Sequence, residues 1–278
     1  MNVSKASVNG VNLHYRISGR GLPLILIAGW GTDLRTWAFQ LRAFQRHFRV
    51  LRFDNRGVGR SDRPRGPYTM KLMASDVIGL MDFLHIKEAN VLGLSMGGMI
   101  AQEVAINYPD RVLKLVLGST FAFQGKGSGP TEEYTRNAGQ DPQQVRMTLA
   151  SLASNGVLTR GIVCFLVTLT SRRKMDGFTA QGAAIRQHDT KDRLHLIRCP
   201  TLVIAGTRDR VIKPSSSELI ASRIARAKLV LIENGSHSLG SENRRIFNRT
   251  VLGFLDGSDE ARALRRASES VASQQTGR

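Results

Sequence analysis

Cysteine is almost absent from this sequence of 278 residues, which contains only Cys164 and Cys199. The two lie far apart and outside any cluster with metal-ligand spacing, so neither a disulfide framework nor a zinc site is expected. Long hydrophobic runs are also missing: residues 22 to 28 and 162 to 169 are far shorter than the roughly 20 residues that cross a bilayer. The first residues lack the apolar stretch and cleavage site of a secretory signal. We therefore expect a cytoplasmic protein without a membrane-spanning helix.

Acidic residues are scarce relative to basic ones, because 22 Asp and Glu stand against 40 Lys and Arg, for a formal net charge of +18. Such a charge would suit a nucleic-acid-binding protein if the basic residues formed a cluster. They are instead spread over the whole chain, which favours a solvated basic surface, and no nucleic-acid partner is expected. Attraction to anionic substrates or to an acidic carrier protein stays open. The sequence does not indicate an oligomeric state.

Six short apolar runs rich in branched residues, each closed by a turn signal, predict buried β-strands. They are residues 22 to 28, 49 to 53, 89 to 93, 112 to 118, 200 to 206 and 228 to 232. Helical periodicity over residues 69 to 84 and 96 to 107 predicts helices between strands. This alternation is typical of an α/β fold with a mostly parallel central sheet that helices cover on both faces. Asn9-Gly10 predicts an antiparallel hairpin at the edge of the sheet.

The alternation stops between residues 121 and 197. Helical patterns follow one another there without a strand, over residues 131 to 137, 142 to 154, 158 to 170 and 177 to 187. We interpret residues 121 to 197 as an all-helical cap, inserted after the sixth strand into a core made of residues 1 to 120 and 198 to 256. The small, polar residues 257 to 278 predict a flexible C-terminal tail.

The segment Gly93-Leu94-Ser95-Met96-Gly97 lies between a predicted strand and an amphipathic helix. In this context the pattern G-x-S-x-G predicts a nucleophile elbow, a sharp turn that lifts the serine hydroxyl out of the sheet. The helix N-terminus and the Met96 backbone N–H would then point at an oxyanion formed beside Ser95. The sequence thus predicts Ser95 as a nucleophile.

A serine needs a base to activate it and an acid to orient that base. With this elbow the expected chain order is serine, acid, histidine. Asp209 follows the strand at residues 200 to 206, and His237 follows the strand at residues 228 to 232, so both occupy loops at the carboxyl edge of the sheet. We predict Ser95, Asp209 and His237 as the catalytic residues. The competing pair His188-Asp189 is interpreted as a structural contact at a helix end.

The loop after the strand at residues 22 to 28 contains Gly29-Trp30-Gly31, whose small residues let backbone amides approach a substrate. We predict the Trp30 N–H as the second oxyanion donor, beside that of Met96. Apolar residues expected to line the substrate pocket are Trp30, Phe121, Phe165 and Leu166, although ordinary packing is an alternative for the last two. Residues 54 to 61 lack the Lys-Ser/Thr ending of a phosphate loop, so structural turns and ion pairs are expected there.

Four motifs extend the pattern beyond the elbow. They are GTDLRTW at residues 31 to 37, FRVLRFDNRGVGRSDRPRGPYTM at 48 to 70, GLSMGGMIAQ at 93 to 102 and QHDTKDRLHLIRCPTLVIAGTRD at 187 to 209. With these motifs the chain resembles the α/β-hydrolase superfamily, and within it the 3-oxoadipate enol-lactonases and related esterases. The resemblance implies the α/β-hydrolase fold with an all-helical cap and a triad of Ser95, Asp209 and His237. Ala28-Gly29 departs from the His-Gly that begins the oxyanion loop in many relatives.

The expected reaction is cleavage of a small-molecule carboxylic ester or lactone through an acyl-enzyme on Ser95, which requires neither a metal nor an organic cofactor. A serine at the elbow, where an aspartate would stand, argues against epoxide hydrolases and haloalkane dehalogenases. The same three residues would also serve a carbon–carbon bond hydrolase or a cofactor-free perhydrolase. A ligand receptor on this scaffold, with little turnover, is a further alternative.

Overall fold

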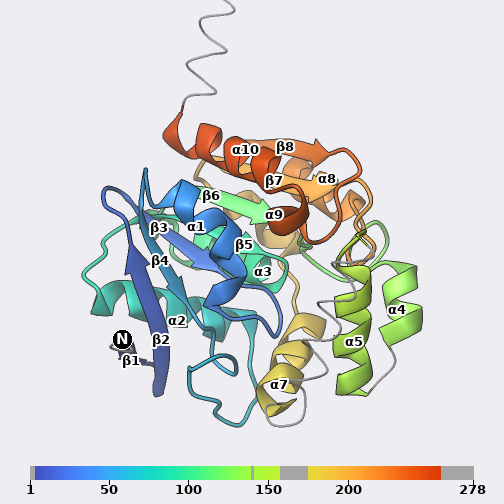
Figure 1. Cartoon of the computed structure of the whole chain (residues 1–278), viewed down its shortest axis with the longest axis horizontal. Coiled ribbons are helices and arrows are strands. Elements are labelled where there is room, and N and C mark those ends of the chain that lie inside the picture. Colours follow the sequence, from blue (N-terminus) through green and yellow to red (C-terminus); the bar gives the residue numbers. More distant parts are fainter. Residues whose placement is uncertain (1–3, 139–140, 157–174, 258–278) are drawn as a thin grey trace, which may run out of the picture.

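The computed structural model describes residues 4–138, 141–156 and 175–257. Eight strands form one sheet in the spatial order β1-β2-β4-β3-β5-β6-β7-β8 (Figure 1). The strands are β1 (Ser4–Val8), β2 (Val11–Ser18), β3 (Pro23–Ile27), β4 (Arg49–Phe53), β5 (Ala89–Leu94), β6 (Val112–Gly118), β7 (Thr201–Gly206) and β8 (Ala227–Ile232). All six strands predicted from apolar runs are present, and no bound differs from its prediction by more than one residue.

The sheet is antiparallel at one edge and parallel elsewhere. Strand β1 pairs with β2, and β2 with β4, in antiparallel fashion, whereas every neighbouring pair from β4 to β8 is parallel. Asn9 and Gly10, which connect β1 and β2, both have positive φ angles of 48° and 74°. Two left-handed residues match the right-handed twist of a two-residue hairpin, so the predicted edge hairpin is confirmed.

Helices cover both faces of the sheet because the parallel strands bury alternate residues on opposite sides. In β3, Ile25 and Ile27 face one apolar cluster and Leu24 and Leu26 face the other. The first cluster includes residues of α2 (Met70–Phe83), α3 (Met96–Asn107) and α8 (Ser215–Arg223); the second includes residues of α1 (Ala38–Phe44), α9 (Leu239–Glu242) and α10 (Arg244–Asp256). The predicted fold class, α/β with a mostly parallel sheet, is confirmed.

Between β6 and β7 the described residues form helices and no strand. They are α4 (Glu132–Ala138), α5 (Pro142–Leu152), α7 (Met175–Arg186) and a 3₁₀ turn at Lys191–Leu196. Helices α4 and α5 lie side by side and α5 also contacts α7, at one end of the sheet (Figure 1). The helix predicted over residues 158 to 170 and the tail beyond residue 257 lie outside the described residues. Within the described ranges, no helix is long and apolar enough to cross a bilayer.

Candidate active site

Ser95 occupies the sharp turn between β5 and α3. Its backbone has φ 55° and ψ −120°, a left-handed conformation that a residue with a side chain adopts only under strain. The Ser95 N–H donates to the Gly118 carbonyl at 2.8 Å, and the Thr120 hydroxyl donates to the Ser95 carbonyl at 2.8 Å. The neighbouring strand β6 and the segment after it therefore hold the turn in place.

Glycine is required on both sides of the serine. A Cβ atom on Gly93 would stand 2.1 Å from the Gly97 carbonyl oxygen, and one on Gly97 would stand 2.0 Å from the Ile27 carbonyl oxygen. Both distances are far inside van der Waals contact with backbone atoms, which have no room to withdraw. The two glycines of the sequence pattern thus allow α3 to start directly against β3 and β5.

His237 and Asp209 lie beside Ser95 in the structure. The His237 Nε2 atom is 3.1 Å from Ser95 Oγ, and His237 Nδ1 is 2.8 Å from Asp209 Oδ2. The other Asp209 oxygen accepts backbone N–H groups of Val211 and Ile212, both at 2.9 Å. Because the Asp209 side chain is only 1 % exposed, these bonds hold the carboxylate in one orientation. The three residues that the sequence singled out thus form one hydrogen-bonded chain.

The loop predicted to supply an oxyanion donor also lies against the serine. A Cβ atom on Gly29 would stand 3.4 Å from the Ser95 Cβ, so the loop backbone approaches Ser95 closely. The Ala28 carbonyl, where relatives often carry histidine, accepts the Asn55 side-chain amide at 3.1 Å. Met96, the first residue of α3, is fully buried, and the first N–H of a helix has no acceptor within the helix. Gly29, which precedes Trp30, and Met96, which follows Ser95, are thus both next to the serine, and the two oxyanion donors stay a prediction.

Helix α7 holds the Trp30 loop from the other side. The Trp30 ring stacks on Phe178 with centroids 4.3 Å apart, and its Nε1–H donates to the Phe178 carbonyl at 2.8 Å. The fully buried Gln181 accepts the Gly31 N–H at 3.0 Å and donates to the Arg56 carbonyl at 2.8 Å. The sequence reasoning missed Gln181, because a glutamine in an amphipathic helix carries no signal of its partners.

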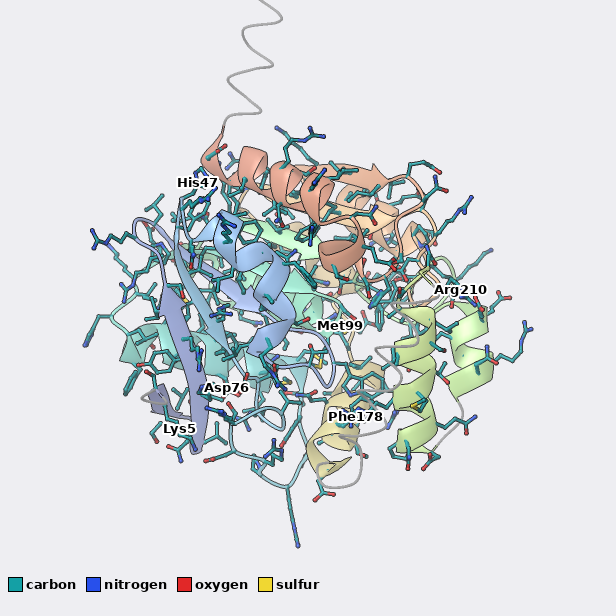
Figure 2. The ribbon with its side chains drawn as sticks, viewed as in Figure 1. Lys5, His47, Asp76, Met99, Phe178 and Arg210 are labelled. Carbon is teal, nitrogen blue, oxygen red and sulfur yellow. The ribbon has the colours of Figure 1, made fainter. Side chains whose placement is uncertain are left out.

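The Asp209 loop is tied to the inserted helices as well. Arg210, next to Asp209, forms an ion pair with Glu133 of α4, in which the Arg210 Nε is 3.0 Å from Glu133 Oε2. Figure 2 labels Arg210 beside α4. The Thr131 N–H also donates to the Val211 carbonyl at 2.9 Å. The ion pair with Arg210 holds the pKa of the Glu133 carboxyl below its usual value.

Glu242 of α9 joins the histidine loop to the end of α5, and the sequence reasoning missed it too. Its carboxylate accepts hydrogen bonds from the hydroxyls of Ser236 and Ser154 and from the Gly156 N–H at 3.0 Å. Burial alone would raise the pKa of Glu242, but these hydrogen bonds lower it below its ordinary value. Since Ser236 directly precedes His237, the carboxylate fixes the backbone from which the imidazole projects.

The remaining predicted residues have different positions. Phe121 is buried, with its ring centroid 6.2 Å from that of His188, whereas Phe165 and Leu166 lie outside the described residues. His188 and Asp189 do not pair: Asp189 accepts the Lys191 N–H at 2.9 Å, and neither ring nitrogen of His188 has a hydrogen-bond partner among the described residues. Burial lowers the pKa of His188 to about 4, so the ring is neutral at physiological pH.

Residues 54 to 61 form turns and ion pairs, as the sequence indicated. Asp54 accepts hydrogen bonds from the His14 ring, the Leu34 N–H and the Arg60 N–H. Arg56 forms a buried two-bond ion pair with Asp76 of α2 (Figure 2). In the part of the chain that the structure describes, no group of three or more His, Cys, Asp or Glu side chains could hold a metal ion.

Comparisons with known proteins agree with the fold described above. Residues 23–161 match the family model described as the alpha/beta hydrolase fold. The chain is 30% identical to 3-oxoadipate enol-lactonase 2 of Acinetobacter baylyi, over 82% of this chain and 86% of the relative.

Solved structures give the same result. The enol-lactonase from Burkholderia xenovorans LB400 superposes with a TM-score of 0.81 at 31% identity, covering 91% of this chain and 100% of that one. A meta-cleavage product hydrolase from Pseudomonas fluorescens IP01 gives 0.80 at 26% identity, with 92% and 98% covered. The family model and the enol-lactonase relative both show that this chain belongs to the alpha/beta hydrolase family.

Proposed function

We propose that this hydrolase cleaves a carboxylic ester or lactone through an acyl-enzyme on Ser95. The observation that carries the proposal is the unbroken chain of hydrogen bonds from Ser95 Oγ to His237, at 3.1 Å, and from His237 to Asp209, at 2.8 Å. A base within hydrogen-bonding reach of the nucleophile, itself oriented by an acid, is the arrangement that activates a serine. The similarity to enol-lactonases supports the ester or lactone class.

The reaction begins when Ser95 Oγ attacks the substrate carbonyl carbon and His237 Nε2 takes the hydroxyl proton. Asp209 accepts the N–H of His237 Nδ1, which fixes the ring orientation and stabilises the imidazolium. The tetrahedral intermediate collapses as His237 returns the proton to the leaving alkoxide, and the acyl group stays on Ser95. A water molecule, deprotonated by His237, then attacks the acyl carbon. His237 returns this proton to Ser95 Oγ as the acyl–oxygen bond breaks and the acid is released.

The backbone N–H groups of Trp30 and Met96 would hold the oxyanion that forms on the carbonyl oxygen. Each is fixed before substrate arrives, Trp30 by its contacts with α7 and Met96 by its place at the start of α3. Removing one such donor slows comparable enzymes on the order of 10²- to 10³-fold. We further propose that residues 121 to 197 act as the cap over this site, because α4, α5 and α7 contact the three loops that carry it.

An organophosphonate probe tests the nucleophile directly. Intact-mass analysis should show one adduct on the native protein and none on Ser95→Ala. The matched control Ser222→Ala, which removes an exposed hydroxyl on α8, should be labelled like the native protein. His237→Ala keeps the hydroxyl but loses its base, so labelling should slow strongly. A folded Ser95→Ala protein that still forms the adduct would refute the proposal.

Turnover assays separate the substrate classes. We expect lactones or p-nitrophenyl esters to be hydrolysed over many turnovers, with a decrease on the order of 10⁴-fold or more in Ser95→Ala. Carbon–carbon bond cleavage is the second candidate, because the chain is 26% identical to a meta-cleavage product hydrolase over 92% of its length. Faster turnover of vinylogous diketones than of any ester or lactone would favour that candidate. Stoichiometric binding without turnover would indicate a receptor.

A further inference from the structure

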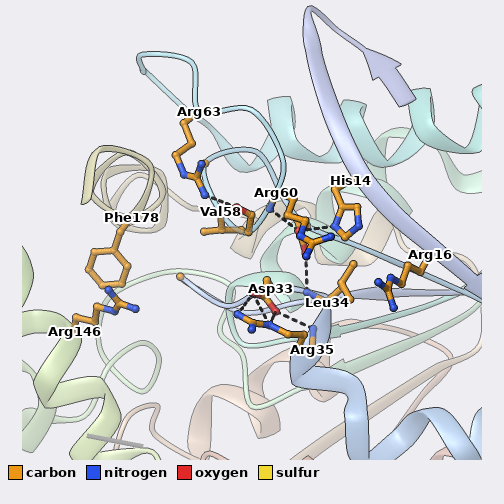
Figure 3. Close-up of a pocket in the computed structure, with 14 residues that line it drawn as sticks. His14, Arg16, Asp33, Leu34, Arg35, Val58, Arg60, Arg63, Arg146 and Phe178 are labelled. Carbon is orange, nitrogen blue, oxygen red and sulfur yellow. Dashed lines mark hydrogen bonds and ion pairs between the residues drawn. The ribbon is translucent and has the colours of Figure 1, made fainter. Parts of the chain in front are cut away.

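A cavity of about 500 Å³ lies between the core and the inserted helices. Its walls come from β2, from the loops at residues 31 to 35 and 57 to 63, and from Phe178 on α7 and Arg146 on α5 (Figure 3). The cavity adjoins the Trp30 loop, since Gly31 lines it and Phe178 stacks on Trp30. Its volume is in the range of small-molecule sites.

Arginine dominates the lining. Five of the 14 lining residues are arginines, whereas Lys and Arg together account for 40 of the 278 residues of the chain. The five are Arg16, Arg35, Arg60, Arg63 and Arg146, and they surround the cavity from several sides (Figure 3). Among the described residues, two carboxylates, those of Asp33 and Asp54, line the same cavity. Positive charge is therefore concentrated here beyond the general excess of the chain.

Both carboxylates already accept hydrogen bonds from neighbouring groups. Asp54 accepts the His14 ring at 2.9 Å and the backbone N–H groups of Leu34 and Arg60, both at 2.8 Å. Asp33 accepts the Arg35 N–H at 2.9 Å and the Arg35 guanidinium at 2.7 Å. Burial alone would raise the pKa of Asp33, but these bonds from Arg35 lower it, so the carboxyl is ionised and occupied. Asp33 therefore neutralises Arg35, but neither aspartate pairs with the side chain of Arg16 or Arg60.

Arg16 and Arg60 have exposed side chains, and neither has a carboxylate partner in the described part of the chain. Arg16 instead stands directly opposite Arg52 in the pairing of β2 with β4. Like charges in directly opposed positions destabilise a strand pair. Burial and the charge of Arg16 both lower the pKa of Arg52, whose buried Nε atom has no hydrogen-bond partner among the described residues. A bound anion would relieve this repulsion.

We propose that this arginine pocket binds a small molecule with two or more negative charges on phosphate or carboxylate groups. Guanidinium groups match both oxyanions with paired hydrogen bonds, and several of them around one cavity favour a multiply charged ligand. The proposal concerns binding at a site separate from the Ser95 hydroxyl, so it does not rest on the hydrolytic mechanism. A ligand here would contact Gly31 and Phe178, the two residues that link the cavity to the Trp30 loop.

Isothermal titration calorimetry at low ionic strength tests the proposal with pyrophosphate and with citrate. The native protein should bind at least one of them with a stoichiometry of one, and the preferred probe identifies phosphate or carboxylate chemistry. Arg16→Gln combined with Arg60→Gln should weaken that binding tenfold or more. Neither side chain has a hydrogen bond or ion pair within the described residues, so the fold should persist, as a thermal melt will check.

The matched control is Arg245→Gln combined with Arg249→Gln, which removes the same charge from exposed positions on α10. It should leave binding within twofold of the native value. Equal weakening by both double variants would mean diffuse attraction to the basic surface and would overturn the proposal, as would a native protein that binds neither probe. Because the readout is binding, such a failure is distinct from a failure of the phosphonate labelling of Ser95.

Discussion

The two inserted helices α7 and α5 meet the active-site loops in different ways. Helix α7 docks by close packing: a Cβ atom on its Gly177 would stand 2.0 Å from the Gly57 carbonyl oxygen, and its Phe178 ring stacks on Trp30. Helix α5 docks by hydrogen bonds at its C-terminal end, where Glu242 accepts from Ser154 and Gly156. The α7 contact thus combines backbone packing with hydrogen bonds of the uncharged Trp30 and Gln181, whereas the α5 contact depends on a carboxylate.

The two helices therefore position different loops of the candidate active site through different interactions. Packing at α7 positions the Trp30 loop, and two backbones in contact tolerate no added atom. The polar contact at α5 positions the histidine loop, and hydrogen bonds to a carboxylate depend on its charge. We therefore expect α7 to respond to volume and the α5 contact to respond to charge and pH.

Gly177→Ala should give the largest effect. The new methyl group would collide with the Gly57 backbone, so we expect a loss of about 2 to 3 kcal/mol in the free energy of unfolding and a lower kcat/KM as the Trp30 loop shifts. Alanine is about 1 kcal/mol more favourable than glycine inside a helix, so without the contact the change would stabilise the protein. Chemical denaturation measures the sign. Thr179→Ala, at an exposed position of the same helix, should change stability little.

Glu242→Gln should have an intermediate effect. The amide leaves one oxygen to accept where the carboxylate had two, so some donors of Ser154, Ser236 and Gly156 lose their partner. We expect a loss of about 1 to 2 kcal/mol in stability, and about a tenfold lower kcat with KM nearly unchanged, since His237 and not the substrate pocket is displaced. Steady-state kinetics tests this expectation, with Glu233→Gln as the control because Glu233 is an exposed carboxylate in the loop that carries His237. A change confined to KM would contradict the positioning role.

The smallest effect on turnover should come from His188, near the C-terminal end of α7, whose substitution changes the pH dependence of stability. Folding lowers the pKa of His188 from 6.5 to about 4. Between these pH values the unfolded chain binds a proton at His188 that the folded protein does not bind. Native stability therefore falls as pH decreases from about 6.5 towards 4, by about 2 kcal/mol at pH 5. His188→Leu and His188→Phe should remove this part of the slope, whatever their effect on stability at neutral pH. An unchanged slope in both variants would refute it.

Glu242 affects stability in a different pH range from His188. Because its pKa is lowered from 4.5 in the folded protein, its stabilising contribution is present above pH 4.5 and is lost as pH falls through the lowered value. Urea unfolding of Glu242→Gln should therefore differ from the native protein in slope only in the acid range below 4.5. Lowering the pH should thus reduce stability through His188 between about 6.5 and 4, and through Glu242 only below 4.5.

Much of the fold was predictable because its signals are local. Apolar runs predicted the strands within one residue, and Asn9-Gly10 predicted the edge hairpin. The elbow motif singled out Ser95, while chain order and strand ends singled out Asp209 and His237, whose side chains the structure places within hydrogen-bonding distance. Each prediction rests on a spacing of a few residues or on the common edge that parallel strands share.

The contacts that hold the site could not be predicted in the same way. In the sequence, Gln181 and Glu242 cannot be told apart from ordinary polar residues on a helix surface. In the structure, both join the inserted helices to loops of the candidate active site. The even spread of basic residues along the chain likewise concealed the convergence of Arg16 and Arg146 on one cavity. Such contacts join residues distant in sequence, so they depend on how the helices seat on the core.

The sequence by itself determined the alternation of strands and helices, the serine elbow with its two glycines, and the net charge of +18. Only the tertiary structure decided which side chains meet across the core and the inserted helices, including the Glu242 contacts, the contact of Gly57 with Gly177 and the arginine pocket. The physical reason is that strand and helix periods repeat every two to four residues and are readable locally. The seating of one helix on another part of the chain depends on the whole set of packed surfaces.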